Sequence, residues 1–274
     1  MDKIKFMKKN TQLTIFLTLA IIVLLIAIFA PAIVPKDPFL TVRNNNLKPL
    51  SAAHIFGTDS LGRDLFSRVI YGSRYSIFMT LTLVFVIFLI GTFLGIIAGY
   101  FGGITDTIIM RIGDMMIAFP GLILAIAIAG LLGPSVINSI IVISAVTWTK
   151  YARLSRSMVL KIKQELYVEA AKVTRSRDYS ILLKYIMPNM ITTMIVTAVS
   201  DLGTLMLEIA ALSFLGFGAQ PPIPEWGAML NEGRTYLSRA PWLMIYPGFA
   251  IVTVVIIFNM LGDSVRDIVD IKSE

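Results

Sequence analysis

Long apolar runs alternate with short polar segments along most of this chain. A helix needs about 20 apolar residues to cross the hydrocarbon core of a bilayer, and the runs have about that length. The pattern therefore predicts an all-α, polytopic membrane protein with six transmembrane helices. The predicted spans cover residues 13–34, 77–100, 106–132, 135–158, 189–215 and 242–261.

The first apolar run follows a short basic tail, and two interpretations compete for it. Four lysines precede it, and Ala30, Pro31 and Ala32 near its end resemble a weak cleavage site, as in a secretory signal peptide. The run from Leu13 to Val34 is longer than the apolar core of about 7 to 15 residues that signal peptides have. We therefore predict that residues 1–34 form a tail and an uncleaved first helix, with the N-terminus inside.

The distribution of basic residues agrees with this topology. Of the 24 Lys and Arg residues, 16 fall in segments predicted to lie inside and 8 in segments predicted outside. Such an excess on the inner side is the usual signal of membrane orientation, and it also places the C-terminal residues 263–274 inside. The formal charge of +7 is explained in this way, so we expect no nucleic-acid partner.

Two polar segments are predicted on the outer side. Residues 35–76 are rich in Pro, Asn and Asp, and Thr58 or Asp59 is expected to cap a short helix on the outer interface before the second span. Residues 216–240 open with three prolines, which predict a non-helical loop. Between the first polar segment and the C-terminal tail, residues 77–262 are expected to form a five-helix core.

Three features within the predicted spans bear on helix packing. The second span carries Gly91, Gly95 and Gly99 at spacings of four, which allow another helix to approach closely. In the third span Pro120 is expected to kink the helix. Arg111 and Asp114 in the same span, three residues apart, are expected to form an ion pair on one face.

The fifth span contains two carboxylates, Asp201 and Glu208, seven residues apart and therefore on the same face. Each would cost about 2.5 to 3.5 kcal/mol at the bilayer centre if it faced lipid, so both should face the bundle interior or water. One interpretation is that they border a path for a solute. The other is that they hold helices together through hydrogen bonds.

A polar, basic stretch at residues 164–188 interrupts the membrane pattern and is predicted to be a helix–turn–helix hairpin in water. Asp178 is a candidate N-cap of the second helix, and Pro188 either ends that helix or starts the next. Each helix has an apolar face. The predicted faces comprise Leu166, Tyr167, Ala170, Ala171 and Thr174 in the first helix, and Tyr179, Leu182, Leu183, Ile186 and Met187 in the second.

An apolar face on a short helix in water must be covered, and no other segment is soluble enough to form a domain that covers it. A partner protein is therefore expected. The alternative interpretation is an amphipathic hairpin that lies on the membrane surface.

Several kinds of chemistry are excluded by the composition. The chain has no cysteine and a single histidine, His54, which argues against disulfides, thiolate or histidine metal sites and a cysteine nucleophile. The phosphate-binding pattern G-x-x-x-x-G-K-[ST] is absent, so we expect the chain neither to bind nor to hydrolyse ATP. No inverted internal repeat is evident, which argues against a secondary transporter.

Glu169, Ala170 and Ala171, followed at the right distance by Ile186 to Asn189, resemble the Glu-Ala-Ala loop of permease subunits in binding-protein-dependent ABC importers. Three further stretches resemble one subfamily, the C-type permeases for dipeptides, oligopeptides and nickel. They are GTDSLGRDLFSRVIYGSRYS (57–76), LSFLGFGAQPPIPEWGAML (212–230) and NMLGDSVRDIVD (259–270).

This resemblance implies the fold of a type I ABC importer permease, a non-catalytic subunit in a prokaryotic cell membrane. It implies a second, homologous permease subunit, two cytoplasmic ATPase subunits that bind ATP and Mg, an extracytoplasmic solute-binding protein and surrounding lipid. Solute identity is largely set by the binding protein in such importers, so peptides and nickel or a metal chelate both stay open. The residues implied in coupling to the ATPase are Leu166, Tyr167, Glu169, Ala170, Ala171, Arg175 and Pro188.

One position departs from the family pattern. The family usually has Gly where this chain has Arg175. Glycine adopts a left-handed turn conformation freely, whereas arginine does so at a steric cost, so we expect the hairpin turn to be built differently here.

Two other classes of protein compete with an importer subunit. An ion-coupled carrier or channel would use Asp201 and Glu208. An intramembrane enzyme would need a paired nucleophile and base, and the sequence offers no such pair. Copurification with an ATPase separates the importer from both.

Overall fold

The computed structural model describes residues 2–273, with side chains described for residues 11–269. The four N-terminal lysines and Lys272, which contribute to the predicted charge bias, have their side chains outside this range. Helices dominate the described chain, and no strand occurs in residues 2–273. The principal helices are α1 (Asp2–Ile33), α2 (Leu65–Phe101), α3 (Gly103–Ile117), α4 (Gly121–Leu132), α5 (Val136–Ile162), α6 (Leu166–Val173), α7 (Asp178–Ile181), α8 (Met187–Phe214), α9 (Trp226–Gly233) and α10 (Trp242–Ser273).

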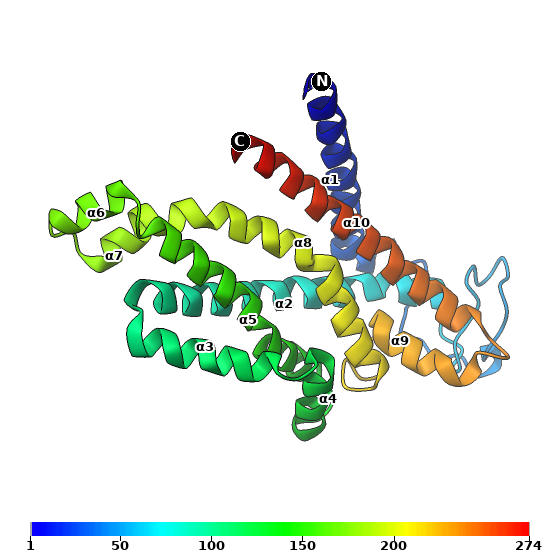
Figure 1. The fold of residues 1–274 in the computed structure, drawn as a ribbon. Coiled ribbons are helices and arrows are strands. Elements are labelled where there is room, and N and C mark those ends of the chain that lie inside the picture. The colour runs from blue at the N-terminus through cyan, green and yellow to red at the C-terminus, as the bar shows by residue number, and fades with distance from the viewer. Residues whose placement is uncertain (1, 274) are drawn as a thin grey trace.

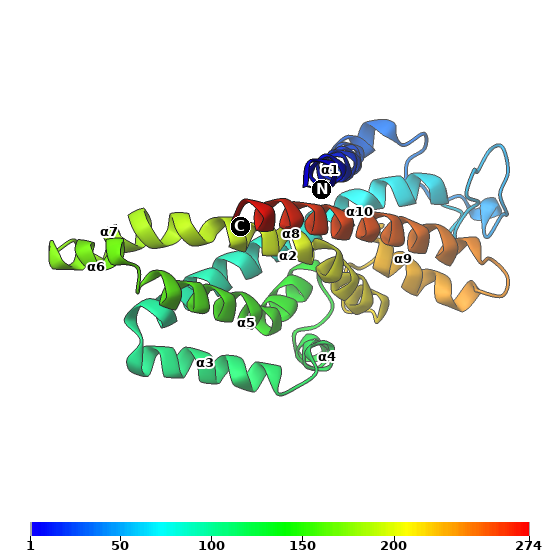
Figure 2. The same cartoon turned by 45° about the horizontal axis from the view of Figure 1, so that its top comes forward.

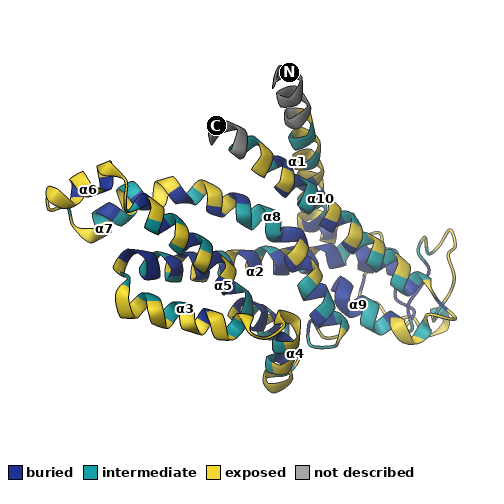
Figure 3. Cartoon of the chain, in the orientation of Figure 1, coloured by how far each residue is buried: buried dark blue, intermediate teal, exposed yellow. Residues whose placement is uncertain are grey.

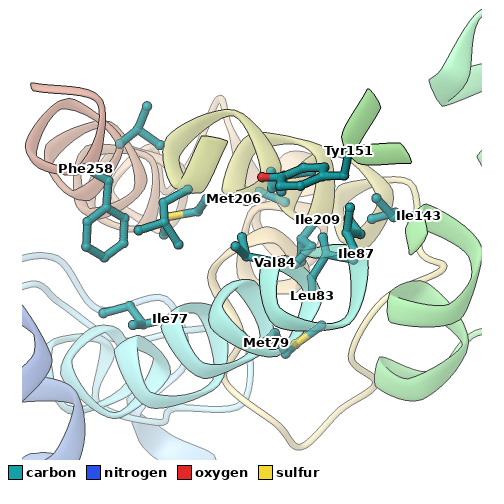
Figure 4. Close-up of a cluster of buried hydrophobic side chains, with 14 of the residues drawn as sticks. Ile77, Met79, Leu83, Val84, Ile87, Ile143, Tyr151, Met206, Ile209 and Phe258 are labelled. Carbon is teal, nitrogen blue, oxygen red and sulfur yellow. The ribbon is translucent and has the colours of Figure 1, made fainter. Parts of the chain in front are cut away.

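The hairpin of α6 and α7 projects from one end of the molecule, and the polar residues 35–64 lie with α9 at the opposite end (Figures 1 and 2). Helix α2 extends between these two ends, and α5, α8 and α10 pack along it or along one another. The shared core is apolar: side chains of α2, α5, α8 and α10 meet there, among them Leu83, Tyr151, Met206 and Phe258 (Figure 4).

The three predicted packing glycines all lie at a close contact between α2 and α5. A Cβ atom added to Gly91 would lie 2.5 Å from the Tyr151 Cβ, and one added to Gly99 would lie 2.9 Å from the Val159 Cβ. A Cβ at Gly95 would overlap the carbonyl oxygen of Ala152. Glycine at these positions therefore lets the two backbones approach within a distance that no other residue allows.

Gly95→Ala is expected to destabilise the protein by about 1 to 3 kcal/mol, because the added methyl group must push α5 away. Gly130→Ala is the matched control, since a Cβ at Gly130 in α4 would meet no atom within 4 Å. Thermal unfolding of both variants in detergent checks this. Equal stability of Gly95→Ala and the unmodified protein would show that α2 and α5 do not need this close approach.

The predicted short helix on the outer interface is wrong. Helix α2 begins at Leu65 and continues unbroken into the second predicted span. Asp64 caps it by accepting a hydrogen bond from the Ser67 amide at 3.0 Å. Asp59, expected to cap an earlier helix, instead accepts bonds from the amides of Leu61 and Arg63 and so closes a turn.

At Pro120 the helix is broken and not merely kinked, so the predicted disturbance was too small. The axes of α3 and α4 differ by 92°, and the Pro120 carbonyl accepts from the amide of Leu124 as α4 begins. Proline lacks an amide hydrogen and disfavours helical geometry in the residue before it, which explains the break. Asp114 pairs with Arg153 of α5 at 2.6 Å, and not with Arg111 as predicted.

In the described residues, four helices are long and apolar enough to cross a membrane, or five if α3 and α4 count as one broken span. The predicted fourth span, α5, is not among them, because its second half carries Lys150, Arg153, Arg156 and Lys161. Six spans with both termini inside therefore stay a prediction. Many large apolar side chains on the outer faces of α1, α2 and α4 are exposed, as expected for helices in contact with lipid (Figure 3).

Two predicted segments contain more helix than expected. The loop at residues 216–240 begins without helix but includes α9 and a 3-10 turn at Arg234–Tyr236. The predicted tail, residues 263–274, continues α10 as far as Ser273.

Candidate functional site

The first helix of the hairpin, α6, has one buried and one exposed face. Val168 and Ala171 are its buried residues, at 0% and 6% exposure, and belong to the same apolar cluster as Ile181. Leu166 and Val173 are 82% and 84% exposed. The helical period places Ala170, also exposed, between these two on the outward face, with Glu169 beside it.

The predicted apolar face of α6 is therefore only partly correct. Leu166, Tyr167 and Ala170 are exposed, but Ala171 packs within the hairpin. Apolar residues occur on both sides of this short helix, and the sequence does not show which side the second arm covers. Val173 completes the exposed face and was missed, although its spacing from Leu166 and Ala170 follows the helical repeat.

The turn after α6 is built as it would be with glycine, so the expectation of a different turn is wrong. Arg175 has a φ of 55°, in the left-handed region. Its amide donates to the Lys172 carbonyl at 3.0 Å, and the Ser176 amide donates to the Ala171 carbonyl at 3.1 Å. This pair of bonds is the Schellman motif that usually ends a helix with glycine.

Arg175→Gly should stabilise the hairpin by about 1 kcal/mol, because glycine reaches this φ without the steric cost that arginine bears. The Arg175 side chain is exposed, so its removal costs no buried contact. Hydrogen exchange of the hairpin amides is the measurement, and slower exchange in the variant is expected. Faster exchange would mean that the side chain, and not the backbone, stabilises the turn.

The second arm of the hairpin continues directly into α8. Residues Leu182–Ile186 form a π-helical turn, in which the Met187 amide donates to the Leu182 carbonyl. Pro188 follows in the first turn of α8, and the Asn189 side chain donates to the Tyr185 carbonyl at 2.5 Å. The wider turn accommodates the proline ring, so Pro188 does not end the helix, and α7 and α8 form one continuous arm.

The prediction that the Asp178 side chain caps α7 is wrong. The N-cap residue is Arg177, and Asp178 is the first residue of the helix. Its carboxylate instead accepts a hydrogen bond from the Tyr100 hydroxyl of α2 at 2.6 Å.

The two carboxylates of the fifth predicted span lie in a charged cluster between α5 and α8. Lys150 donates to both carboxylate oxygens of Asp201, at 2.6 and 2.8 Å, and the Tyr151 hydroxyl donates to the second at 3.0 Å. Glu208 is half-buried and close enough to Asp201 and Lys150 to interact with both. The Asp201 side chain is 14% exposed and that of Lys150 is 57% exposed, so the cluster opens to the surface of the single chain.

At the end of the molecule opposite the hairpin, two arginines join residues 35–64 to α9. Arg63 contacts Asp59 at 2.5 Å and Glu232 at 3.0 Å, and Arg68 contacts the same two acids at 3.4 and 3.1 Å. Both arginines and Asp59 are buried, so each charge has a partner in the place of water.

Two further acids at this end fix the start of α2 and of α9. Burial raises the pKa of Asp64, but hydrogen bonds from the Ser67 amide and from His54 outweigh this effect and hold the pKa below its usual value. Burial raises the pKa of Glu225, although the amides of Gly227 and Ala228, at 2.9 and 2.8 Å, donate to it. These contacts make the polar end an ordered part of the fold.

Within the described residues, no group of three or more His, Cys, Asp or Glu side chains is arranged to hold a metal ion. The sequence pattern did not indicate Lys150 and Tyr100 as the partners of Asp201 and Asp178. Each lies on a different helix from its partner, and no local spacing in the sequence reveals such a pair.

Membrane-length apolar helices with a projecting amphipathic hairpin define a multi-pass membrane protein. Residues 91–273 match the family described as binding-protein-dependent transport system inner membrane component. The chain belongs to this family, and it is a multi-pass permease component of a prokaryotic cell membrane.

Several proteins are similar over nearly the whole chain. The dipeptide transport system permease protein DppC of Alkalihalophilus pseudofirmus is 44% identical, over 99% of this chain and 89% of that protein. The probable D,D-dipeptide transport system permease protein DdpC of Escherichia coli is 41% identical, over 99% and 91%. The glutathione transport system permease protein GsiD of Pectobacterium atrosepticum is 41% identical, over 92% and 84%.

A solved structure of the MetNI methionine ABC transporter in an inward-facing conformation contains a chain of similar fold. The TM-score is 0.59 at 19% identity, over 74% of this chain and 97% of that chain. This likeness supports the fold of an ABC importer permease.

Proposed function

We propose that this chain is one of two homologous permease subunits that form the translocation path of an ATP-driven importer of short peptides. The similar proteins named for dipeptides, D,D-dipeptides and glutathione support a short-peptide solute. Nickel or a metal chelate, which the subfamily resemblance also implies, is the second solute class. An extracytoplasmic binding protein would deliver the solute and largely set its identity.

The exposed face of α6 is the observation that carries the coupling part of this proposal. Leu166, Ala170 and Val173 form an apolar strip on a helix that projects from the bundle, with Glu169 at its edge. An amphipathic helix with anchors at this spacing fits a groove on a partner protein. We assign that groove to a cytoplasmic ATPase subunit, two of which would bind the ATP and Mg that this chain does not bind.

The charged cluster is proposed to border the translocation path. Asp201 and Glu208 share a face of α8, and Lys150 adds a cation to it from α5. In a pair of membrane helices, a partly exposed charged cluster of this kind suits one wall of a water-filled path. A second permease subunit would supply the other wall.

Uptake in a strain that lacks this subunit, restored by a tagged copy, tests the proposal. The panel includes dipeptides, glutathione, longer peptides and nickel chelates, and ATPase subunits are sought in the material recovered through the tag. We expect dipeptide or glutathione uptake that requires the ATPase. Uptake that survives loss of every ATPase would favour an ion-coupled carrier that uses Asp201 and Glu208, and nickel uptake alone would refute the peptide solute.

A further inference from the structure

Tyr100 lies where the ends of three helices meet. It occupies the last turn of α2, with its side chain buried, and its hydroxyl donates to Asp178 of α7 at 2.6 Å. Lys163, which caps the end of α5, donates to the Tyr100 carbonyl at 2.6 Å and lies 5.5 Å from the centre of its ring. A single residue thus joins α2, α5 and the hairpin.

Helix α2 connects this junction with the other end of the molecule. Its 37 residues make a rod about 55 Å long, since an α-helix rises 1.5 Å per residue. Near its start, the Val69 carbonyl accepts from the Trp226 indole at 2.8 Å, and the Ser76 hydroxyl donates to Glu225 at 3.1 Å. The end of α2 that meets the hairpin and the end that holds α9 therefore belong to the same stiff element.

The hairpin is joined covalently to α5 before α6 and to α8 after α7, but it meets α2 through non-covalent contacts. Its second arm is continuous with α8, so α8 must follow any movement of the hairpin. Helix α2 has no covalent connection to the hairpin, so it must follow through contacts, either along its packing with α5 and α8 or directly at its own end. The hydrogen bond between Tyr100 and Asp178 is a directional contact of that kind, with a charged acceptor.

We propose that the hydrogen bond between Tyr100 and Asp178 transmits movement of the hairpin to α2, so that α2 and α8 move together when the ATPase acts. Tyr100 is thus a positioning residue for transport, and its effect reaches α9 through the length of α2. This inference rests on the proposed function, because it requires an ATPase that moves the hairpin.

Tyr100→Phe removes only the hydroxyl and keeps the ring beside Lys163. We expect ATPase recovery through the tag to be unchanged, while solute-stimulated ATP hydrolysis and uptake both fall about tenfold, as loss of a hydrogen bond to a charged group predicts. Asp178→Asn keeps an acceptor oxygen and should retain activity, whereas Asp178→Ala should match Tyr100→Phe. The double variant Tyr100→Phe/Asp178→Ala should be no worse than either single variant, since both remove the same bond.

Tyr75→Phe, on the same helix far from the hairpin, is the matched control and should leave all three measurements unchanged. Unchanged stimulation of ATP hydrolysis and unchanged uptake in Tyr100→Phe would overturn the proposal. Loss of ATPase recovery in this variant would also overturn it, because the hydrogen bond would then serve only to hold the hairpin in place for ATPase binding. If the unmodified chain itself recovers no ATPase, the proposed function fails. If it does and Tyr100→Phe is fully active, only this inference fails.

Discussion

A tryptophan at Ala170 is expected to prevent recovery of ATPase subunits with this chain, while the chain itself stays folded in the membrane. Ala170 is exposed on α6 between Leu166 and Val173, so a larger side chain there disturbs no contact within the chain. In a close-fitting groove the added volume should cost about 1 to 3 kcal/mol or more. That corresponds to association weakened roughly 5- to 150-fold. ATPase recovered through a tag and solute uptake are the two measurements.

Ala171→Trp provides the contrasting control. Ala171 is buried in the hairpin, so a tryptophan there should lower the amount of folded chain before any partner is involved. Glu169→Ala adds no volume and removes a charged group from the rim, and we expect ATP hydrolysis and uptake to fall together. Normal ATPase recovery with normal uptake in Ala170→Trp would remove the coupling role of α6.

Breaking the ion pair between Lys150 and Asp201 is expected to have the second large effect. Lys150→Met leaves the Asp201 carboxylate with only the Tyr151 hydroxyl as a donor. An uncompensated carboxylate within the membrane costs about 2.5 to 3.5 kcal/mol, so less protein should accumulate and uptake should fall at least tenfold. The amount of the chain in the membrane and the uptake per chain are measured separately.

The double variant Lys150→Met/Asp201→Asn separates the two interpretations of this cluster. It leaves no charge at position 201, so the amount of folded protein should rise above that of Lys150→Met alone. If the cluster borders the translocation path, uptake per chain stays low. If it only holds α5 and α8 together, uptake recovers along with the protein, and the path assignment is lost.

Because the chain has no cysteine, single cysteines can report whether water reaches this cluster. Cysteines at Asp201 and Glu208 should react with a water-soluble thiol reagent in the assembled transporter. A cysteine at Leu207, exposed on a different face of α8, is the control and should react less. Failure of both test positions to react in every nucleotide state would favour the structural interpretation.

The sequence predicted features that depend on one helix and missed those that depend on two. The spacing of Gly91, Gly95 and Gly99 indicated a close helix contact, and the structure identifies α5 as the partner. Asp201 and Glu208 were placed on one face by helical geometry alone. Their cationic neighbour Lys150 could not be predicted, since it is 51 residues away and only tertiary packing brings it near.

The errors in the hairpin have local causes. Apolar side chains on both sides of α6 made its inward face ambiguous, so Ala171 was assigned to the wrong side. At Arg175 the hydrogen bonds that end the helix outweigh the steric cost of a left-handed arginine. The conformational preference of arginine alone had predicted a different turn. At Pro120 the sequence indicated a disturbance, but its size depends on how α3 and α4 pack on α5.

The break at Pro120 also bears on how the protein enters the membrane. Helix α4 has 12 residues and is about 18 Å long, too short to cross a hydrocarbon core of about 30 Å. Helix α3 and the second half of α5 both carry charged side chains, which would oppose the entry of either helix into the membrane by itself. Asp106 pairs with Arg156 at 2.5 Å and Asp114 with Arg153 at 2.6 Å, so each helix neutralises charges of the other. These two ion pairs therefore lower the electrostatic cost of placing α3 and α5 side by side in the membrane.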